Sequence, residues 1–349
     1  MIPMDAGFSR SNRIVMRISL IHVALLLGPL FPVSALSAAD QLRRGERKET
    51  TKAEAPRKEE KKDEPAQSPV EIIKNISYRD DEAADPTRHK LDLYLPRGAK
   101  DFPIVFFVHG GAWRAGNKDE YPRLGEFFAT EGIGCVVINY RLSPKVQHPA
   151  HIEDVARAFA WTVANIEKYG GRKDRIFAVG HSAGGHLVAL LATDATYLKN
   201  EGLALTDIRG VIPISGVHQI NSALPMFRNI FSRDKEECRL ASPITHVSNG
   251  HPPFLLLYAE NDLPLLGRMA EDMSEVLKKN QCDVECLKID QRNHMTIITQ
   301  LSQENDPTRQ AVFDFIGRHS DWQPAARAEA ANGNKREAGT TDAAMKDDK

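Results

Sequence analysis

The chain between residues 71 and 321 alternates short apolar runs with longer segments in which apolar residues recur at helical spacing. Continuous apolar runs bounded by polar or glycine-rich stretches are typical of strands buried on both faces of a sheet. Such runs occupy residues 103–108, 135–140, 176–179, 210–216 and 253–258, and residues 284–289 predict a further strand. Two earlier segments, 72–78 and 90–95, predict opening strands, which we expect to be antiparallel and at the edge of the sheet.

Helices are predicted between these strands. Ile152, Val155, Phe159 and Ile166 share one helical face, and the pattern ends at a pair of glycines. Further helices are predicted at residues 122–131, 263–279 and 308–318, and directly after residue 184. Strands that alternate with helices imply βαβ units. The sequence therefore predicts one α/β domain over residues 71–321, with a mostly parallel central sheet and helices on both faces.

The two ends of the chain have a different composition. Residues 1–39 have the layout of a secretory signal peptide, with arginines, an apolar run over residues 18–31 and then small residues. The run is shorter than the roughly 20 residues of a spanning helix, and an uncleaved membrane anchor is the alternative. Residues 40–70 and 322–349 are predicted to be a disordered charged linker and a disordered tail. We therefore expect an exported protein, periplasmic or extracellular, that contacts a membrane only if the signal is uncleaved.

Composition and cysteine positions exclude several classes of function. The formal net charge of −1 gives no basic excess for binding nucleic acid. Cys282 and Cys286 lie on one predicted strand, about 13 Å apart, which is too far for a disulfide. Their spacing does not match a zinc site, and Cys135 is predicted to lie in the core. A bridge that involves Cys238 stays open, as does the oligomeric state.

The pentapeptide Gly180-His181-Ser182-Ala183-Gly184 separates a predicted strand from a predicted helix. Strand, G-x-S-x-G and helix together form a nucleophile elbow, in which a sharp turn exposes the serine hydroxyl. The N-terminus of the helix offers the Ala183 N–H to a developing oxyanion. Ser182 is therefore the candidate nucleophile, and the alternative is an ordinary turn.

A nucleophilic serine needs a base and an acid that orients the base. In the elbow fold these follow the serine, on loops after later strands. Glu260 and Asp262 follow the strand at 253–258, and His294 follows the strand at 284–289. The carboxyl ends of parallel strands share one edge of a sheet, so these side chains should meet Ser182 there. Their spacing alone does not choose between the two carboxylates.

The other histidines are weaker candidates for the base. His186 is expected to pack, because the elbow aims Ser182 away from the following helix. His148 and His151 are expected to be a satisfied loop pair and not metal ligands. His109 is expected to shape the glycine loop after the strand at 103–108, and His181 to fill a variable position of the pentapeptide.

Four motifs in combination resemble the α/β-hydrolase esterases. They are His109-Gly110-Gly111-Ala112-Trp113, Tyr140-Arg141-Leu142-Ser143-Pro144, His148-Pro149-Ala150 with Asp154, and the elbow. The resemblance covers residues 105–294 and is closest to carboxylesterases, feruloyl-type esterases and kynurenine formamidases that carry H-G-G-x-W. It implies an α/β-hydrolase fold with Ser182 as nucleophile, His294 as base and Asp262 as acid. It also implies an oxyanion hole built from the N–H groups of Gly110, Gly111 and Ala183. One departure is Ala112, where hormone-sensitive-lipase-like esterases carry a third glycine.

We expect from this combination a secreted serine carboxylesterase that works through an acyl-enzyme and needs no metal or organic cofactor. Its substrate would be a small-molecule or polysaccharide-linked ester. Residues 217–251 form a roomy insertion whose apolar side chains either cap the acyl pocket or pack as an ordinary connection. Two alternatives remain: an amidase of the kynurenine formamidase type, and an inactive binding protein with a hydrolase fold.

Overall fold

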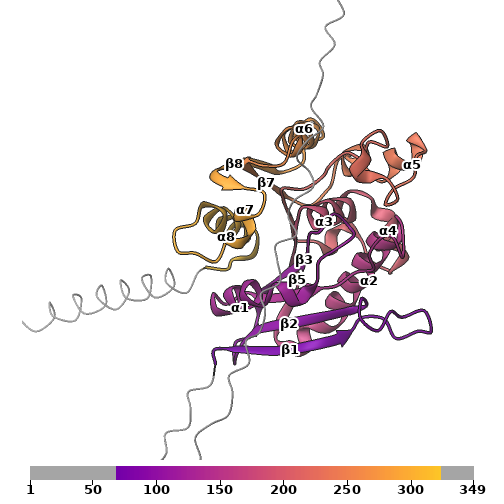
Figure 1. Cartoon of the computed structure of the whole chain (residues 1–349). Coiled ribbons are helices and arrows are strands. Elements are labelled where there is room, and N and C mark those ends of the chain that lie inside the picture. The colour runs from indigo at the N-terminus through magenta and orange to yellow at the C-terminus, as the bar shows by residue number, and fades with distance from the viewer. Residues whose placement is uncertain (1–67, 324–349) are drawn as a thin grey trace, which may run out of the picture. The chain divides into compact units, whose positions relative to one another are not determined.

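A computed structural model describes residues 68–323 of the chain (Figure 1). The expected signal peptide, the linker up to residue 67 and the tail beyond residue 323 lie outside the described residues. Within residues 68–323, no helix is long and apolar enough to cross a membrane. All four cysteines are free, so the bridge left open for Cys238 is not formed.

Eight strands form one sheet in the order β1-β2-β4-β3-β5-β6-β7-β8 (Figure 1). The predicted antiparallel edge is confirmed, because β1 pairs antiparallel with β2, and β2 pairs antiparallel with β4. The strands from β3 to β8 are parallel. The strand bounds are β1 Val70–Ser77, β2 Lys90–Pro96, β3 Phe102–Val108, β4 Gly134–Ile138, β5 Gly171–His181, β6 Gly210–Ile214, β7 Phe254–Asn261 and β8 Val284–Asn293.

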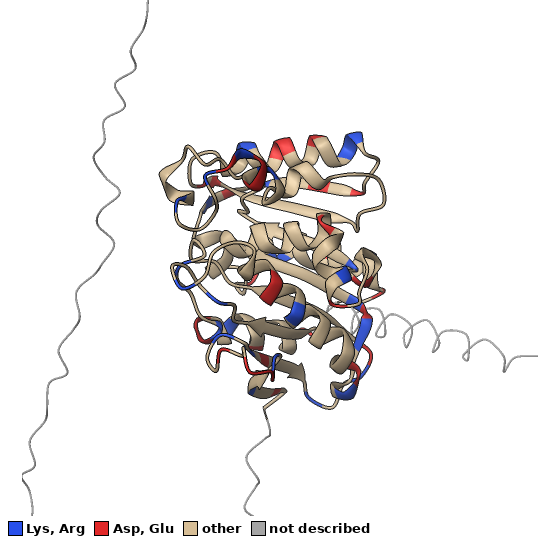
Figure 2. Cartoon of the chain, turned by 90° about the vertical axis from the view of Figure 1, so that its right-hand side faces the viewer, with Lys and Arg blue, Asp and Glu red and all other residues tan. Residues whose placement is uncertain are grey.

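Helices cover both faces of the sheet, as predicted. Alternate residues of β3 point to opposite faces, so that Phe106 joins the core under α2, α3 and α6, whereas Phe107 joins the core under α1, α7 and α8. The α-helices are α1 Pro122–Thr130, α2 Ala150–Asn165, α3 Ala183–Thr193, α4 Ala195–Asn200, α5 Lys235–Leu240, α6 Leu266–Lys279, α7 Thr296–Thr299 and α8 Pro307–Ser320. Short 3₁₀-helices are Lys118–Glu120, Ile166–Tyr169, Leu205–Asp207, Pro225–Phe227 and Pro243–His246. Figure 2 shows Lys, Arg, Asp and Glu positions on loops and helices of the described residues.

Three strands extend beyond the apolar runs that predicted them. β5, β7 and β8 continue through residues with exposed side chains, because pairing with a neighbouring strand satisfies their backbone without an apolar face.

The predicted start of α6 at residue 263 is wrong. The helix begins at Leu266, after Leu265 adopts a left-handed backbone with φ of 77°. The residues before it form the turn that carries Asp262.

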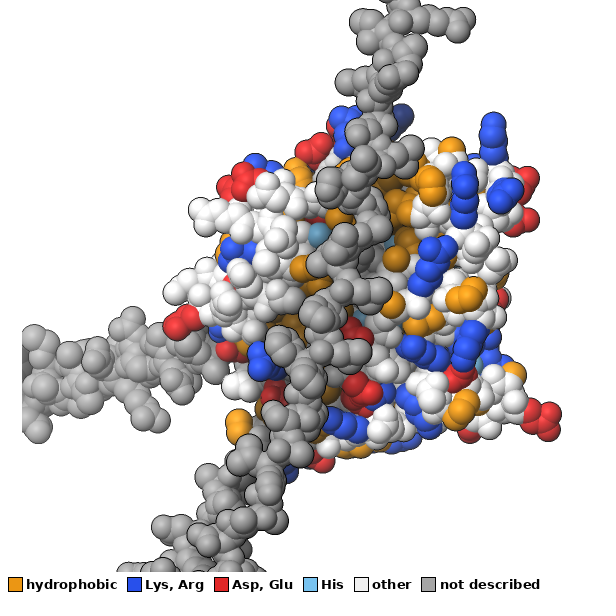
Figure 3. Space-filling view, in the orientation of Figure 1, with side chains coloured by type: hydrophobic (Ala, Val, Ile, Leu, Met, Phe, Trp, Pro, Cys, Tyr) orange, Lys and Arg blue, Asp and Glu red, His pale blue; other side chains and the backbone are white. Residues whose placement is uncertain are grey.

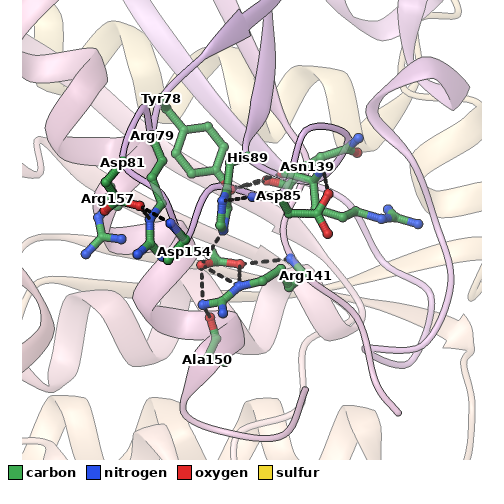
Figure 4. A network of polar contacts seen from close by, with 12 residues as sticks. Tyr78, Arg79, Asp81, Asp85, His89, Asn139, Arg141, Ala150, Asp154 and Arg157 are labelled. Atoms are coloured by element: carbon green, nitrogen blue, oxygen red, sulfur yellow. Dashed lines mark hydrogen bonds and ion pairs between the residues drawn. The ribbon is translucent and has the colours of Figure 1, made fainter. Parts of the chain in front are cut away.

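A buried carboxylate joins the loops on one side of the sheet (Figure 4). Asp154, in α2, is 1% exposed. It accepts hydrogen bonds from Nε2 of His89 at 3.0 Å, and from the backbone N–H and the guanidinium of Arg141 at 2.9 and 2.7 Å. Nδ1 of His89 accepts the N–H of Asp85 at 2.7 Å, which leaves the His89 proton on Nε2. The β1–β2 loop and the loop after β4 are thereby tied to α2.

Asp154→Ala is expected to lower the free energy of unfolding by about 3–5 kcal/mol, because it removes the buried partner of two polar side chains. Urea unfolding of the full chain measures the change. Glu153→Ala is the matched control, since Glu153 is an exposed carboxylate on the same helix, and it should change the free energy by less than about 0.5 kcal/mol. Equal effects of the two substitutions would contradict this role of Asp154.

The contribution of Asp154 to stability is expected to depend on pH. Burial acts to raise the pKa of Asp154, but the hydrogen bonds from His89 and Arg141 outweigh it and hold the pKa below its ordinary value. A carboxylate whose pKa is lower in the folded state than in the unfolded state stabilises the fold at pH values above the unfolded-state pKa of about 3.9. This stabilisation is lost as the pH falls through the folded-state pKa. The stability difference between wild type and Asp154→Asn should therefore shrink below about pH 4.

Candidate active site

Ser182 occupies a strained turn between β5 and α3. Its backbone has φ of 54° and ψ of −117°, a conformation that residues with a side chain rarely adopt. Two glycines make the turn sterically feasible. A Cβ on Gly180 would lie 2.3 Å from the carbonyl oxygen of Gly184, and a Cβ on Gly184 would lie 2.0 Å from that of Val108. The elbow predicted from G-x-S-x-G is therefore present in its strand–turn–helix context.

The structure brings Ser182, His294 and Asp262 into one line of hydrogen bonds. Nε2 of His294 lies 3.0 Å from Oγ of Ser182, and Nδ1 lies 2.7 Å from Oδ1 of Asp262. The carboxylate can only accept, so the imidazole proton sits on Nδ1, and Nε2 is free to accept the serine proton. Asp262 directly follows β7 and His294 directly follows β8. The three side chains thus come from the carboxyl ends of parallel strands.

Glu260, the other candidate acid, lies elsewhere. It belongs to β7, where its carboxylate accepts the N–H of Gln291 in the neighbouring strand at 2.9 Å. The same carboxylate lies 3.9 Å from Nζ of Lys288. Its contacts are therefore with β8, and the structure places Asp262 against His294.

Asp262 is held by four hydrogen bonds. Oδ1 also accepts the N–H of Leu263 at 2.8 Å, and Oδ2 accepts the N–H of Ala259 at 3.0 Å and the hydroxyl of Ser215 at 2.5 Å. Burial acts to raise the pKa of Asp262, but these donors and His294 outweigh it and lower the pKa below its ordinary value. The carboxylate is therefore kept ionised and fixed in orientation.

Sequence reasoning missed Ser215. The residue follows β6 with φ of 50° and is buried. The signal that could have found it is its place at the carboxyl end of a predicted strand, on the same edge of the sheet as the other site residues.

His181 was also missed, because its pentapeptide position accepts many residue types. Its ring is buried, and Nε2 donates to the backbone carbonyl of His294 at 2.7 Å. The two rings are 4.7 Å apart between centroids. Burial and the neighbouring His294 lower the pKa of His181 to about 4. His181 is thus a neutral donor that fixes the loop carrying His294.

The glycine loop after β3 lies against the nucleophile. A Cβ on Gly110 would be 3.2 Å from Cβ of Ser182. Gly111 has φ of 114°, and its carbonyl accepts the N–H groups of Arg114 and Ala115 at 3.0 and 2.9 Å, which closes the loop into a tight turn. Ala112 has φ of 51°, so the departure from a third glycine leaves the left-handed backbone in place.

The oxyanion hole expected from the N–H groups of Gly110, Gly111 and Ala183 stays a prediction. Ala183 is the first residue of α3, where an N–H has no partner within the helix. Burial raises the pKa of Tyr121 to about 12, while the Gly110 N–H, which donates to the Tyr121 hydroxyl oxygen, acts in the opposite direction. Tyr121 is therefore a neighbour of the glycine loop that the sequence did not indicate.

The remaining histidines behave largely as expected. His186 packs and accepts the Nε1–H of Trp113 at 3.3 Å. Nδ1 of His109 bonds the carbonyl of Gly110 at 2.7 Å and shapes the glycine loop. The expectation of a satisfied pair at His148 and His151 is wrong in part, because Nδ1 of each is buried without a partner. Burial lowers both pKa values to about 4, which keeps the rings neutral among aromatic neighbours.

Most apolar side chains of the insertion at 217–251 pack into the core. Phe227 and Phe231 are buried with their rings against Trp113, at centroid distances of 6.0 and 5.0 Å. Met226 remains 48% exposed. The insertion therefore braces the glycine loop through Trp113. Within residues 68–323, no group of three or more His, Cys, Asp or Glu side chains could hold a metal ion.

Asp262→Asn is expected to lower kcat by about 10⁴-fold, because an amide cannot hold the imidazole in the tautomer that accepts the serine proton. Glu260→Gln removes a neighbouring carboxylate that contacts β8, and should cost less than about tenfold. Steady-state kinetics on one ester, with circular dichroism to verify folding, provide the comparison. The reverse ranking would transfer the role of the acid to Glu260.

Comparison with known proteins places this geometry in a family. The family model described as BD-FAE matches residues 91–277. The probable carboxylic ester hydrolase LipM of Mycobacterium tuberculosis is 36% identical over 178 residues, which cover 46% of this chain and 41% of LipM. Esterase LipQ of the same organism is 31% identical over 62% of this chain and 55% of LipQ. The chain thus spans about half the length of these relatives or less. The kynurenine formamidase of Danio rerio is 26% identical over 73% of this chain and 85% of its own length.

Solved structures agree on the fold. A truncated carbohydrate esterase from gut microbiota superposes with a TM-score of 0.62 at 20% identity, over 74% of this chain and 99% of that chain. Esterase B of Lactobacillus rhamnosis gives a TM-score of 0.62 at 21% identity, over 74% and 91%. The predicted α/β-hydrolase fold is confirmed. Because the family model spans more than half of the chain and includes the elbow, the chain belongs to the BD-FAE family of α/β-hydrolases.

Proposed function

We propose that the chain is a serine hydrolase of carboxylic esters that works through an acyl-enzyme. The observation that carries the proposal is the continuous path from Oγ of Ser182 through the imidazole of His294 to Asp262, at 3.0 and 2.7 Å. All three members are present and in contact. This arrangement speaks against an inactive binding protein, which would have no use for an aligned base.

The chemistry follows from the positions of the protons. His294 takes the Ser182 proton at Nε2 as Oγ attacks the ester carbonyl, and Asp262 stabilises the resulting imidazolium. The oxyanion lies against the N–H groups of Gly110, Gly111 and Ala183. His294 then protonates the leaving alcohol, and later activates the water that releases the acid. The neutral donor His181 holds the His294 loop in place during both steps.

Apolar side chains around the site favour an organic acyl group. Leu263 and Leu265 follow Asp262, and Met295 follows His294, with 48%, 56% and 56% of their surfaces exposed. Figure 3 shows hydrophobic side chains gathered on one face of the molecule. Large apolar side chains left exposed beside a site can contact the apolar part of a substrate.

We propose esters and not amides as the substrates, because the relatives with higher identity, at 36% and 31%, are named as ester hydrolases. The amidase alternative is supported by the kynurenine formamidase match, which covers a larger share of both chains at 26% identity. A polysaccharide-linked ester is the proposed substrate class. The name of the carbohydrate esterase that shares this fold supports it, by analogy of fold alone.

The wild-type chain is expected to hydrolyse 4-nitrophenyl acetate, feruloyl methyl ester and acetylated xylan faster than N-formylkynurenine. Ser182→Ala should reduce ester turnover by at least about 10⁴-fold, since the nucleophile is lost. Ser248→Ala, the same change in an exposed loop, should leave turnover unaltered. Preference for N-formylkynurenine would support the amidase function. The absence of turnover with every substrate would support an inactive binding protein.

Export is proposed from the layout of residues 1–39. The mature protein should begin between Leu36 and Asp40, after the small residues that follow the apolar run. N-terminal sequencing of material exported by an expressing cell measures the site of cleavage. An N-terminus that retains Arg17 would show that the apolar run is an anchor.

A further inference from the structure

A cationic pocket lies beside the glycine loop of the site. Its volume is about 320 Å³, and its walls come from the β1–β2 loop, the glycine loop and the segment after β4. Four cationic side chains line it, namely Arg88, Arg114, Arg141 and Lys145, together with the carboxylate of Asp85. Figure 3 shows Lys and Arg side chains on the same face of the molecule as a group of hydrophobic side chains.

The charges of the lining do not cancel. Arg141 is neutralised by the buried Asp154. Oδ1 of Asp85 is occupied by the N–H groups of Thr87 and Arg88. Within the described residues, no ion pair joins Arg88, Arg114 or Lys145 to a carboxylate. The pocket therefore keeps a positive charge in a chain whose formal net charge is −1.

Two of these guanidinium groups are held in place by uncharged acceptors. Nη1 of Arg88 donates to the carbonyl of Gly116 at 2.8 Å, and Nη2 of Arg114 donates to the carbonyl of Arg228 in the insertion. A guanidinium has five N–H donors, so each group keeps donors for a ligand. Carbonyl partners fix the position of a cation without cancelling its charge, which is the preorganisation that carboxylate binding needs.

The pocket and the oxyanion donors share one turn of chain. The Arg114 N–H bonds the Gly111 carbonyl at 3.0 Å, and a Cβ on Gly116 would lie 2.4 Å from the Gly110 carbonyl oxygen. Arg114 follows Gly110 by four positions, so their Cα atoms are at most about 15 Å apart. The pocket therefore lies close enough to the glycine loop for one substrate to contact both.

We propose that this pocket binds a carboxylate of the substrate, so that the preferred esters are those of acidic oligosaccharides. The inference rests on the proposed ester hydrolysis and names its substrate class. Arginine recognises carboxylates through paired N–H donors, and Arg88 and Arg114 supply these from two different segments. Binding remote from the reacting carbonyl acts equally on ground state and transition state, so its loss raises KM more than it lowers kcat.

The test compares acetylated xylo-oligosaccharides with and without a glucuronic acid branch, hydrolysed by the full chain. Wild type should favour the acidic ester by about tenfold in kcat/KM, as charge-assisted hydrogen bonds predict. Arg114→Gln and Arg88→Gln should bring the ratio close to one, chiefly through KM. Added sodium chloride should also lower the ratio, because the pocket is open to solvent. Lys279→Gln is the matched control: it removes one charge at the end of α6, and should keep the wild-type ratio.

A second measurement separates this inference from the proposed function. The Ser182→Ala chain is titrated with the deacetylated acidic oligosaccharide in a calorimeter, with the neutral one for comparison. Tighter binding of the acidic sugar, lost when Arg114→Gln is added, supports the pocket even if no ester is turned over. Equal hydrolysis of both esters, or equal binding of both sugars, would overturn the inference while leaving ester hydrolysis intact.

Discussion

The site depends on a steric constraint, the contact of backbone with backbone around the turn at Ser182. Gly184 packs on the carbonyl of Val108 at the end of β3, and a Cβ on Gly185 would lie 2.9 Å from Cα of Gly216, just past β6. The elbow is therefore locked between the segments that follow the strands on either side of β5. One of those segments carries Gly110 and Gly111, which we propose as oxyanion donors, and the other supplies Ser215, which donates to Asp262. A larger residue at these glycines would separate the nucleophile from both.

Two buried carboxylates stabilise different parts of this arrangement. Asp154 ties α2 to the loops on one side of the glycine turn, and Asp262 orients the base on the other. Each is surrounded by hydrogen-bond donors that offset the cost of burying its charge. His181 completes the site as an uncharged donor, because a second imidazolium next to His294 would oppose the charge that develops there during catalysis. The site is thus assembled from fixed dipoles and one ionised acid.

Local patterns predicted the framework well. Continuous apolar runs located the central strands, because β3, β4 and β6 are buried on both faces and carry a continuous signal. The positions of Ser182, a carboxylate and His294 after β5, β7 and β8 also followed from the sequence, since the carboxyl ends of parallel strands share one edge. The structure places the three side chains together there.

The sequence could not identify contacts that exist only after folding. Ser215 reaches Asp262 across 47 positions, and His181 reaches the carbonyl of His294 across 113. Neither residue type is distinctive at its place in the chain. Residue patterns alone left Glu260 and Asp262 open, and only the resemblance implied Asp262. The structure adds the path of the chain after β7, where α6 begins at Leu266 and Asp262 contacts His294. Residues of this kind are fixed by tertiary geometry.

The central claim is that Ser182 forms a covalent acyl-enzyme. It is tested most directly by mixing the wild-type chain with a slowly deacylated aryl ester, quenching in acid and measuring the mass of the intact protein and its peptides. The account predicts a mass increase equal to the acyl group, located on the peptide that contains Ser182. Complete turnover of the ester with no acylated peptide, or acylation of another residue, would contradict it.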